Sequence, residues 1–249
     1  MWFGDLPVKL NLVATVAFVC SSSFAMAGTI DFSTSGGAAL SDGDILTTFD
    51  FGAGITGSAS AVNSNGSGVD TALVFDTDLS YTADPDLESP FALAGSSGAV
   101  TRSFGNAIIV QENEAIDDVF TPDDDGRGGV LTFAFDNLIE LGVLSLLDAE
   151  QNTSVTLFNN GSVVATLFAD SADTNNRVTP NLFTTVDFGG QVGNSFAIDF
   201  NGRSGGLGEF VASSTVNNNA PAPVPLPAAG WMLLAGVGGL FGVRRKARK

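Results

Sequence analysis

Two acidic loops carry the residues whose types and spacing could hold a metal ion. The first follows an apolar segment, 73–75, and the second follows another, 107–111. Calcium takes about six to eight oxygen ligands, and loops at one end of a β-sheet structure can bring carboxylates together around it. The sequence therefore predicts a calcium site with these candidate ligands: Asp76, Asp84, Asp86, Glu112 and Asp123. The alternative is that both loops are simply solvated, since neither has the Asp-x-Asp-x-Asp-Gly spacing of an EF-hand.

The sequence offers few residues for catalytic chemistry. The chain has no histidine, and its one cysteine, Cys20, and its lysines all lie outside 28–227. A Ser-His-Asp triad, a Cys-His dyad, a histidine zinc site and a Schiff-base lysine are thus excluded for that segment. A glycosidase needs only two carboxylates, but no spacing selects a pair from these glutamates: Glu112, Glu114, Glu140, Glu150 and Glu209. We predict that the protein is not an enzyme.

Charge is strongly unbalanced in the same segment. It contains 26 of the chain's 27 acidic residues but only four arginines, which gives a net charge of −22. Such a surface repels nucleic acid, so no nucleic-acid partner is expected. It favours solubility and cation binding instead.

Alternating apolar residues predict an all-β fold. The pattern has a period of two in 131–135, 155–157, 163–167, 186–188 and 196–200, which is typical of half-buried strands. Asn159-Asn160-Gly161-Ser162 predicts a hairpin turn, and the glycine pairs 189–190 and 205–206 also predict turns. About ten short strands indicate a β-sandwich, of jelly-roll type. The apolar segment Ile139 to Leu147 could form a short helix, although its neighbours favour a buried strand.

The N-terminus has the pattern of a secretory leader. Lys9 precedes an apolar stretch, 10–19, and Ala25-Met26-Ala27 is the small-x-small pattern that signal peptidase accepts. We therefore expect residues 1–27 to be a signal peptide cleaved after Ala27. Cys20 does not indicate a lipoprotein, because the bulky Val19 precedes it.

The C-terminus has three parts in a fixed order. A short motif, Val224-Pro225-Leu226-Pro227-Ala228, is followed by an uncharged segment up to Val243 and then by a basic cluster that includes Arg244, Arg245 and Lys246. The uncharged segment can enter a bilayer as a helix while the basic cluster stays in the cytoplasm. An ordinary membrane anchor is the alternative to a processed tail.

This order of motif, helix and basic cluster resembles the PEP-CTERM sorting signal in its VPLPA-CTERM form. The resemblance covers residues 224–249 and implies recognition by an exosortase, a membrane protease or transpeptidase that cleaves near the motif. It implies further that the protein is bacterial, is exported across the inner membrane, and is held by its C-terminal helix before processing. The family's usual Pro-Glu-Pro is replaced here by Val-Pro-Leu-Pro-Ala.

The expected organisation is a signal peptide (1–27), a β-sandwich ectodomain (28–212), an Asn/Pro-rich linker (213–223) and the sorting signal (224–249). The expected function is that of a structural or adhesive protein at the cell surface or in an extracellular, biofilm-associated matrix. Its expected partners are signal peptidase, an exosortase-like protease and extracellular polysaccharide. The alternative functions are a carbohydrate-binding module and a carboxylate-dependent glycosidase.

Overall fold

The computed structural model describes residues 27–64, 69–95, 101–113, 121–149, 152–169 and 181–215. The predicted leader up to Met26, most of the linker and the whole sorting signal lie outside these residues. None of the described segments forms a helix with the length and apolar character that a membrane crossing requires.

The described residues form an all-β structure with one short 3₁₀ turn, η1 (Pro85–Leu87), which confirms the predicted fold class. Most of the strands belong to one large, mainly antiparallel sheet, while β2 and β3 form a separate pair. The strands are β1 (Gly28–Ile30), β2 (Thr34–Ser35), β3 (Ala38–Ala39), β4 (Thr48–Asp50), β5 (Thr56–Asn63), β6 (Ala72–Asp76), β7 (Phe91–Leu93), β8 (Thr101–Arg102), β9 (Asn106–Val110), β10 (Gly129–Leu147), β11 (Ser154–Asn159), β12 (Ser162–Phe168), β13 (Asn181–Asp199) and β14 (Gly206–Ser214).

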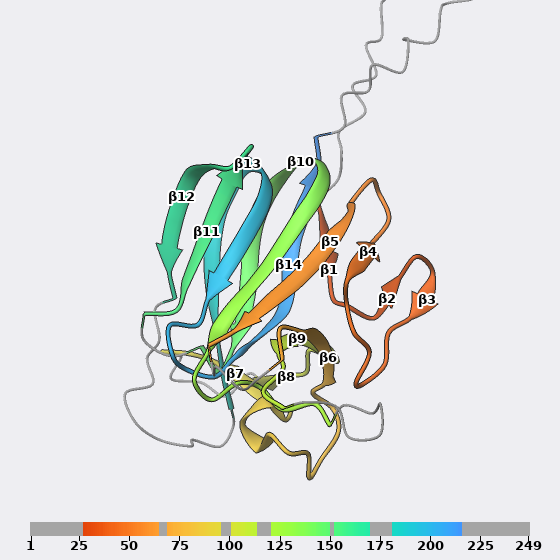
Figure 1. Cartoon of the computed structure of the whole chain (residues 1–249), viewed down its shortest axis with the longest axis vertical. Coiled ribbons are helices and arrows are strands. Elements are labelled where there is room, and N and C mark those ends of the chain that lie inside the picture. The colour runs from red at the N-terminus through yellow and green to blue at the C-terminus, as the bar shows by residue number, and fades with distance from the viewer. Residues whose placement is uncertain are drawn as a thin grey trace, which may run out of the picture.

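Two long strands, β10 and β13, fold the sheet into two layers. The first half of β10 pairs with β5 and with the second half of β13, which also pairs with β11. The second half of β10 pairs with the first half of β13 and with β14. The register shifts between Ala134 and Ile139, where the strands pass from one layer to the other. Figure 1 shows the front layer, from β12 to β5, packed across β14, an arrangement consistent with the predicted β-sandwich.

The length of these two strands differs from the prediction of short strands. The backbone continues as strand through Asp136 to Leu138, which are an exposed part of β10. Gly189 and Gly190 were predicted to form a turn between strands, which is wrong. They lie inside β13 with φ of 62° and 80°, where three residues of β13 stand opposite Gly142 alone. This bulge, which is larger than the usual two residues opposite one, bends the strand without ending it.

Other local predictions are confirmed. Ile139 to Leu147 is strand and not helix. Asn160 and Gly161 form a two-residue loop between β11 and β12, with φ of 50° and 78°. Positive φ at both positions is what a type I′ turn requires, and asparagine followed by glycine tolerates it best.

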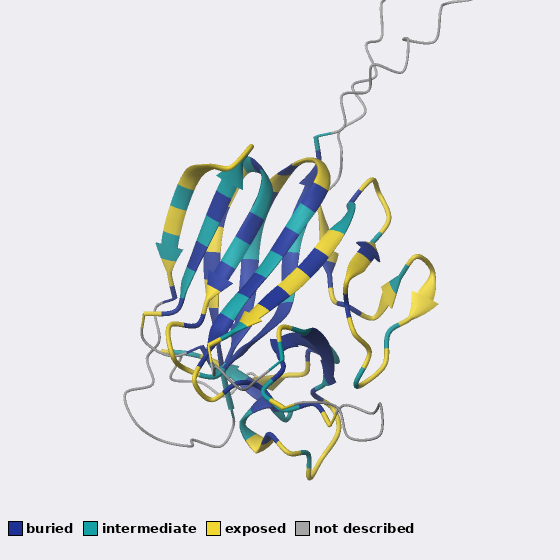
Figure 2. Cartoon of the chain, viewed as in Figure 1, coloured by how far each residue is buried: buried dark blue, intermediate teal, exposed yellow. Residues whose placement is uncertain are grey.

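Phenylalanine side chains form the centre of the core between the layers. Leu131, Phe133 and Phe135 of β10 all point inward, as their alternation predicts. The Phe133 ring lies 5.1 Å from that of Phe196 and 5.9 Å from that of Phe210, measured between centroids. Alternating buried and exposed residues along the strands are visible in Figure 2.

A smaller second core lies below the main one and supports the acidic loops. Strands β6 and β9 bury side chains on both faces, and Leu73, Phe75 and Ile109 face the smaller core. Leu87 of η1 and Phe91 of β7 complete it, both fully buried. The loop between β6 and β7 is therefore anchored by packing at its end.

Candidate metal centre

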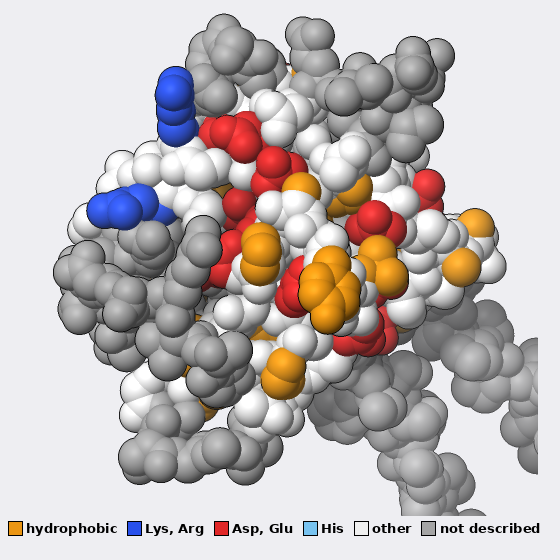
Figure 3. All heavy atoms as spheres, turned by 90° about the horizontal axis from the view of Figure 1, so that it is seen from below, with side chains coloured by type: hydrophobic (Ala, Val, Ile, Leu, Met, Phe, Trp, Pro, Cys, Tyr) orange, Lys and Arg blue, Asp and Glu red, His pale blue; other side chains and the backbone are white. Residues whose placement is uncertain are grey.

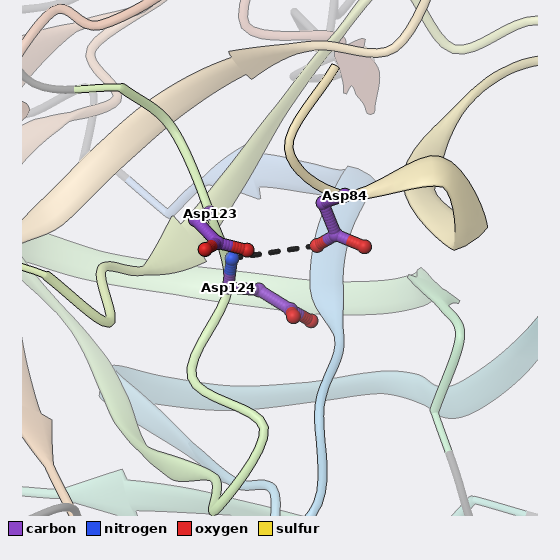
Figure 4. Close-up of side chains that lie close together, drawn as sticks. All are labelled: Asp84, Asp123 and Asp124. Atoms are coloured by element: carbon purple, nitrogen blue, oxygen red, sulfur yellow. Dashed lines mark hydrogen bonds between the residues drawn. The ribbon is translucent and has the colours of Figure 1, made fainter. Parts of the chain in front are cut away.

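Three aspartates from two distant loops meet at the lower end of the sandwich. Asp84 immediately precedes η1, and Asp123 and Asp124 lie shortly before β10. One carboxylate oxygen from each of the three lies within 4.8 Å of the others, and Figure 4 shows the side chains facing one another. Asp84 is 5% exposed, Asp124 is 6% exposed and Asp123 is half-buried. We call these three residues the aspartate cluster.

Main-chain amides from two loops hold the cluster. The amide of Asp124 donates to Oδ2 of Asp84 over 3.3 Å, which ties the two loops together. The amide of Gly205 donates to Oδ2 of Asp124 from the loop between β13 and β14. A β-carbon at Gly205 would lie 2.8 Å from the Phe200 ring, so only glycine brings this amide so close.

Gln111 positions the second loop. Its side chain is completely buried. Its Nε2 donates to the carbonyl of Thr121 over 2.9 Å, and its Oε1 accepts from the amide of Asp123 over 3.2 Å. Both contacts fix the backbone from which Asp123 and Asp124 project. Sequence reasoning missed this role, although a glutamine that ends the apolar run 107–110 was a usable signal.

Replacing Gln111 with alanine should therefore loosen the cluster. The carbonyl of Thr121 and the amide of Asp123 lose a part-buried hydrogen bond each, which costs about 1–3 kcal/mol of the free energy of unfolding. Chemical denaturation measures this loss. Gln191 in β13 is exposed and provides the matched control, since its replacement by alanine should change stability by less than about 0.5 kcal/mol. Equal effects of the two substitutions would contradict the positioning role.

The first loop is shaped by its own side chains. The Glu88 carboxylate accepts from the amide of Thr82 over 2.6 Å and from its hydroxyl over 3.0 Å. The Nδ2 of Asn181, at the start of β13, donates to the carbonyls of Pro85 and Glu88 over 2.9 and 2.7 Å. These bonds keep Asp84 at the end of the sandwich.

Burial and like charge act together on the cluster. Burial raises the pKa of Asp123 to about 6, and the charges of Glu112 and Asp86 add to the shift. Burial also raises the pKa of Asp84, with a hydrogen bond to Asp86 and the charge of Asp124 acting the same way. Burial raises the pKa of Asp124 as well, against hydrogen bonds from Asp84 and the Gly205 amide. The cluster therefore retains protons that ordinary aspartates release.

The structure brings together most of the predicted ligands. Asp84 and Asp123 belong to the cluster, while Asp86 and Glu112 are near enough to raise the pKa of Asp123. Asp124 was in the predicted loop but was not selected as a ligand. Asp76 lies outside the group of three. It ends β6, where its carboxylate accepts from the Asp78 amide and its own amide donates to Asp42.

The arrangement fits the requirements of calcium. Two oxygens bound to one Ca²⁺ at about 2.3–2.6 Å can be at most about 5 Å apart, and the 4.8 Å limit of the cluster meets this condition. Hard oxygen donors without sulfur or imidazole suit calcium better than zinc or copper. Figure 3 shows acidic side chains gathered across this end of the molecule.

Three of the glutamates considered for glycosidase chemistry are described by the structure, and each has different neighbours. Glu209 is held by Arg102 through two bonds of 2.9 and 2.7 Å and by the Ser145 hydroxyl. Glu140 accepts from Ser213 over 3.3 Å, and Glu112 lies beside the cluster. Glu114 and Glu150 are outside the described residues.

Comparisons with known proteins find a distant structural likeness. No family model matches the chain, and no curated protein matches it. Among solved structures, the chain is similar to a fucose binding module of Streptococcus pneumoniae, with a TM-score of 0.26 and 13% sequence identity. The match covers 33% of this chain and 62% of that chain.

Proposed function

We propose that this chain is an exported structural or adhesive protein of the cell surface or extracellular matrix, whose sandwich binds calcium at the aspartate cluster. The observation that carries the calcium part is the meeting of Asp84, Asp123 and Asp124, two of them buried, from loops about 40 residues apart in sequence. Burying like charges is costly unless a cation or a proton compensates them. Calcium is the compensation available outside the cytoplasm.

The role of calcium would be structural. The cluster ties together the loop after β6, the loop before β10 and the loop that joins β13 to β14. An ion bound there links segments that are distant in sequence. It stabilises only the folded state, because the unfolded chain does not form the site. Residues 28–227 contain no cysteine, so no disulfide can link these loops.

The proposal of export is supported by the two ends of the sequence. They carry the leader pattern that ends at Ala27 and the tail that resembles a VPLPA-CTERM signal. The proposed partners are signal peptidase, then an exosortase-like protease while the C-terminal helix holds the protein in the membrane. The sandwich, for which we propose jelly-roll connectivity, then acts outside the cell among extracellular polysaccharides.

Calorimetric titration with calcium tests the metal site directly. At pH 8 the purified protein should bind calcium, and replacing both Asp84 and Asp123 with asparagine should remove most of the binding heat, because two charged ligands are lost. Asp187 in β13 is exposed, so Asp187→Asn is the control and should bind like the wild type. Unchanged binding by the double variant would place calcium elsewhere.

Mass spectrometry of the protein from its native host tests export separately. The expected mature chain begins at Gly28 and ends near the 224–228 motif. Replacing Pro225 and Pro227 with alanine should leave the C-terminal helix attached and the protein in the membrane fraction. An intact chain in the cytosol, with leader and tail both present, would refute the proposed export.

A further inference from the structure

The strand at one end of the sheet, β12, is an exposed edge. Among the described residues it pairs only with β11, so one row of its backbone amides and carbonyls faces outward. Val163 is 62% exposed and Phe168 is 67% exposed. The strand at the opposite end of the same path, β6, is by contrast buried along most of its length. Figure 2 shows β12 as the least buried strand of the front layer.

Apart from one bulge at Val164, next to the turn, this edge lacks the usual protection against pairing. Natural edge strands carry charges, prolines or bulges, or are very short. β12 has seven residues, Ser-Val-Val-Ala-Thr-Leu-Phe, without charge, proline or glycine. A register shift occurs next to the turn, opposite Leu157 and Phe158, and pairing with β11 is regular from Ala165 to Phe168.

The charge distribution indicates which partner can approach this edge. Residues 151–169 contain no charged side chain, although the chain carries 37 charged residues in total and is strongly acidic. Copies of such a protein repel one another over most of their surface. They do not repel one another along β11 and β12, so this edge is where two copies can meet. A basic partner would instead be attracted to the acidic end.

We propose that β12 pairs antiparallel with β12 of a second copy and forms a closed dimer with one continuous sheet. Twofold pairing uses each edge once, so association stops at two copies. Ala165 and Leu167 pack against the core, which places Thr166 and Phe168 on the outer face, and Val164, at the bulge, is 40% exposed. A twofold axis at Thr166 places Phe168 opposite Val164 of the other copy, and Thr166 opposite Thr166 of the other copy. Aromatic with β-branched and threonine with threonine are favourable cross-strand pairs.

Cysteine cross-linking tests this register in the full chain. Cys20 is replaced by serine in every variant, since it is the only native cysteine. Thr166→Cys should then form a disulfide-linked dimer on oxidation, because side chains directly opposite one another come within disulfide reach. Thr156→Cys is the matched control. Thr156 lies on the neighbouring strand β11, beside Thr166 and on the same face, with 3.0 Å between the two hydroxyls, and should remain uncross-linked.

A second variant tests the dimer without cross-linking. Thr166→Lys places a charge on the edge. Light scattering of the wild type and the variant in the same detergent should show a shift from dimer to monomer. The melting temperature of the monomer should be unchanged. A wild-type monomer, or a dimer that persists in Thr166→Lys, would overturn the proposal. Equal cross-linking of Thr166→Cys and Thr156→Cys would also overturn it. None of these results depends on calcium, so the proposed metal site stands or falls separately.

Discussion

Raising the pH from 5 to 8 in the presence of a calcium chelator should markedly destabilise the protein. The pKa values of Asp84, Asp123 and Asp124 are raised in the folded state, that of Asp123 to about 6. The folded state therefore holds protons that the unfolded state has already released above pH 4. Stability from these groups is fully present below their unfolded pKa and is lost as the pH rises through the folded values.

The expected loss is on the order of 3 kcal/mol between pH 5 and pH 8, since one pKa unit corresponds to about 1.4 kcal/mol. Buried Asp84 and Asp124 account for most of it, and half-exposed Asp123 for less. Urea denaturation at a series of pH values measures the effect. Replacing Asp84 and Asp124 with asparagine should flatten the pH profile, because neutral amides have no proton to lose. A profile that stays as steep in this variant would assign the effect to other groups.

Replacing Phe133 with alanine should lower the free energy of unfolding by about 3–5 kcal/mol. Phe133 is completely buried, and its ring lies within about 6 Å of four others. Truncation removes this apolar contact area and leaves a cavity that the paired strands cannot close. For a domain of this size, the melting temperature should fall by roughly 6–20 °C.

Val62 provides the control for this substitution. It lies on β5, which pairs with the same part of β10, but its side chain is 58% exposed. Val62→Ala should therefore change stability by only about 0.5 kcal/mol or less. Similar losses from Phe133→Ala and Val62→Ala would mean that the phenylalanine cluster is not the stabilising core.

The fold could be predicted from sequence wherever local pattern decides it. The alternation of Leu131, Phe133 and Phe135 assigned their face correctly, and Asn160-Gly161 located a hairpin. The continuity of β10 and β13 could not be predicted, because it depends on bulges that pairing partners impose. At Gly189 and Gly190 a glycine pair has positive φ in a bulge as readily as in a turn.

The candidate site, like the fold, could be predicted from the sequence only in part. Composition alone indicated that the two acidic loops could converge. Choosing among neighbouring aspartates required the path of each loop. The amide of Asp124 donates to Asp84 and its carboxylate lies in the same group of three, whereas the Asp76 carboxylate accepts from the Asp78 amide at the end of β6. Gln111 acts through two backbone groups that sequence does not place. The sequence could thus predict which loops carry the candidate ligands, but it could not predict the residues that position them.

Thermal melting with and without millimolar calcium, at pH 8 and at pH 5, tests the calcium site most directly. At pH 8 Asp123 and Asp124 are largely ionised, because their pKa values are raised only to about 6 and about 7. Calcium at about 100 times its dissociation constant should then add about 2.7 kcal/mol, or roughly 5–10 °C. At pH 5 protons occupy the same carboxylates, so we expect a much smaller shift. A melting temperature that calcium leaves unchanged at pH 8, or raises equally at both pH values, would contradict calcium binding by the aspartate cluster.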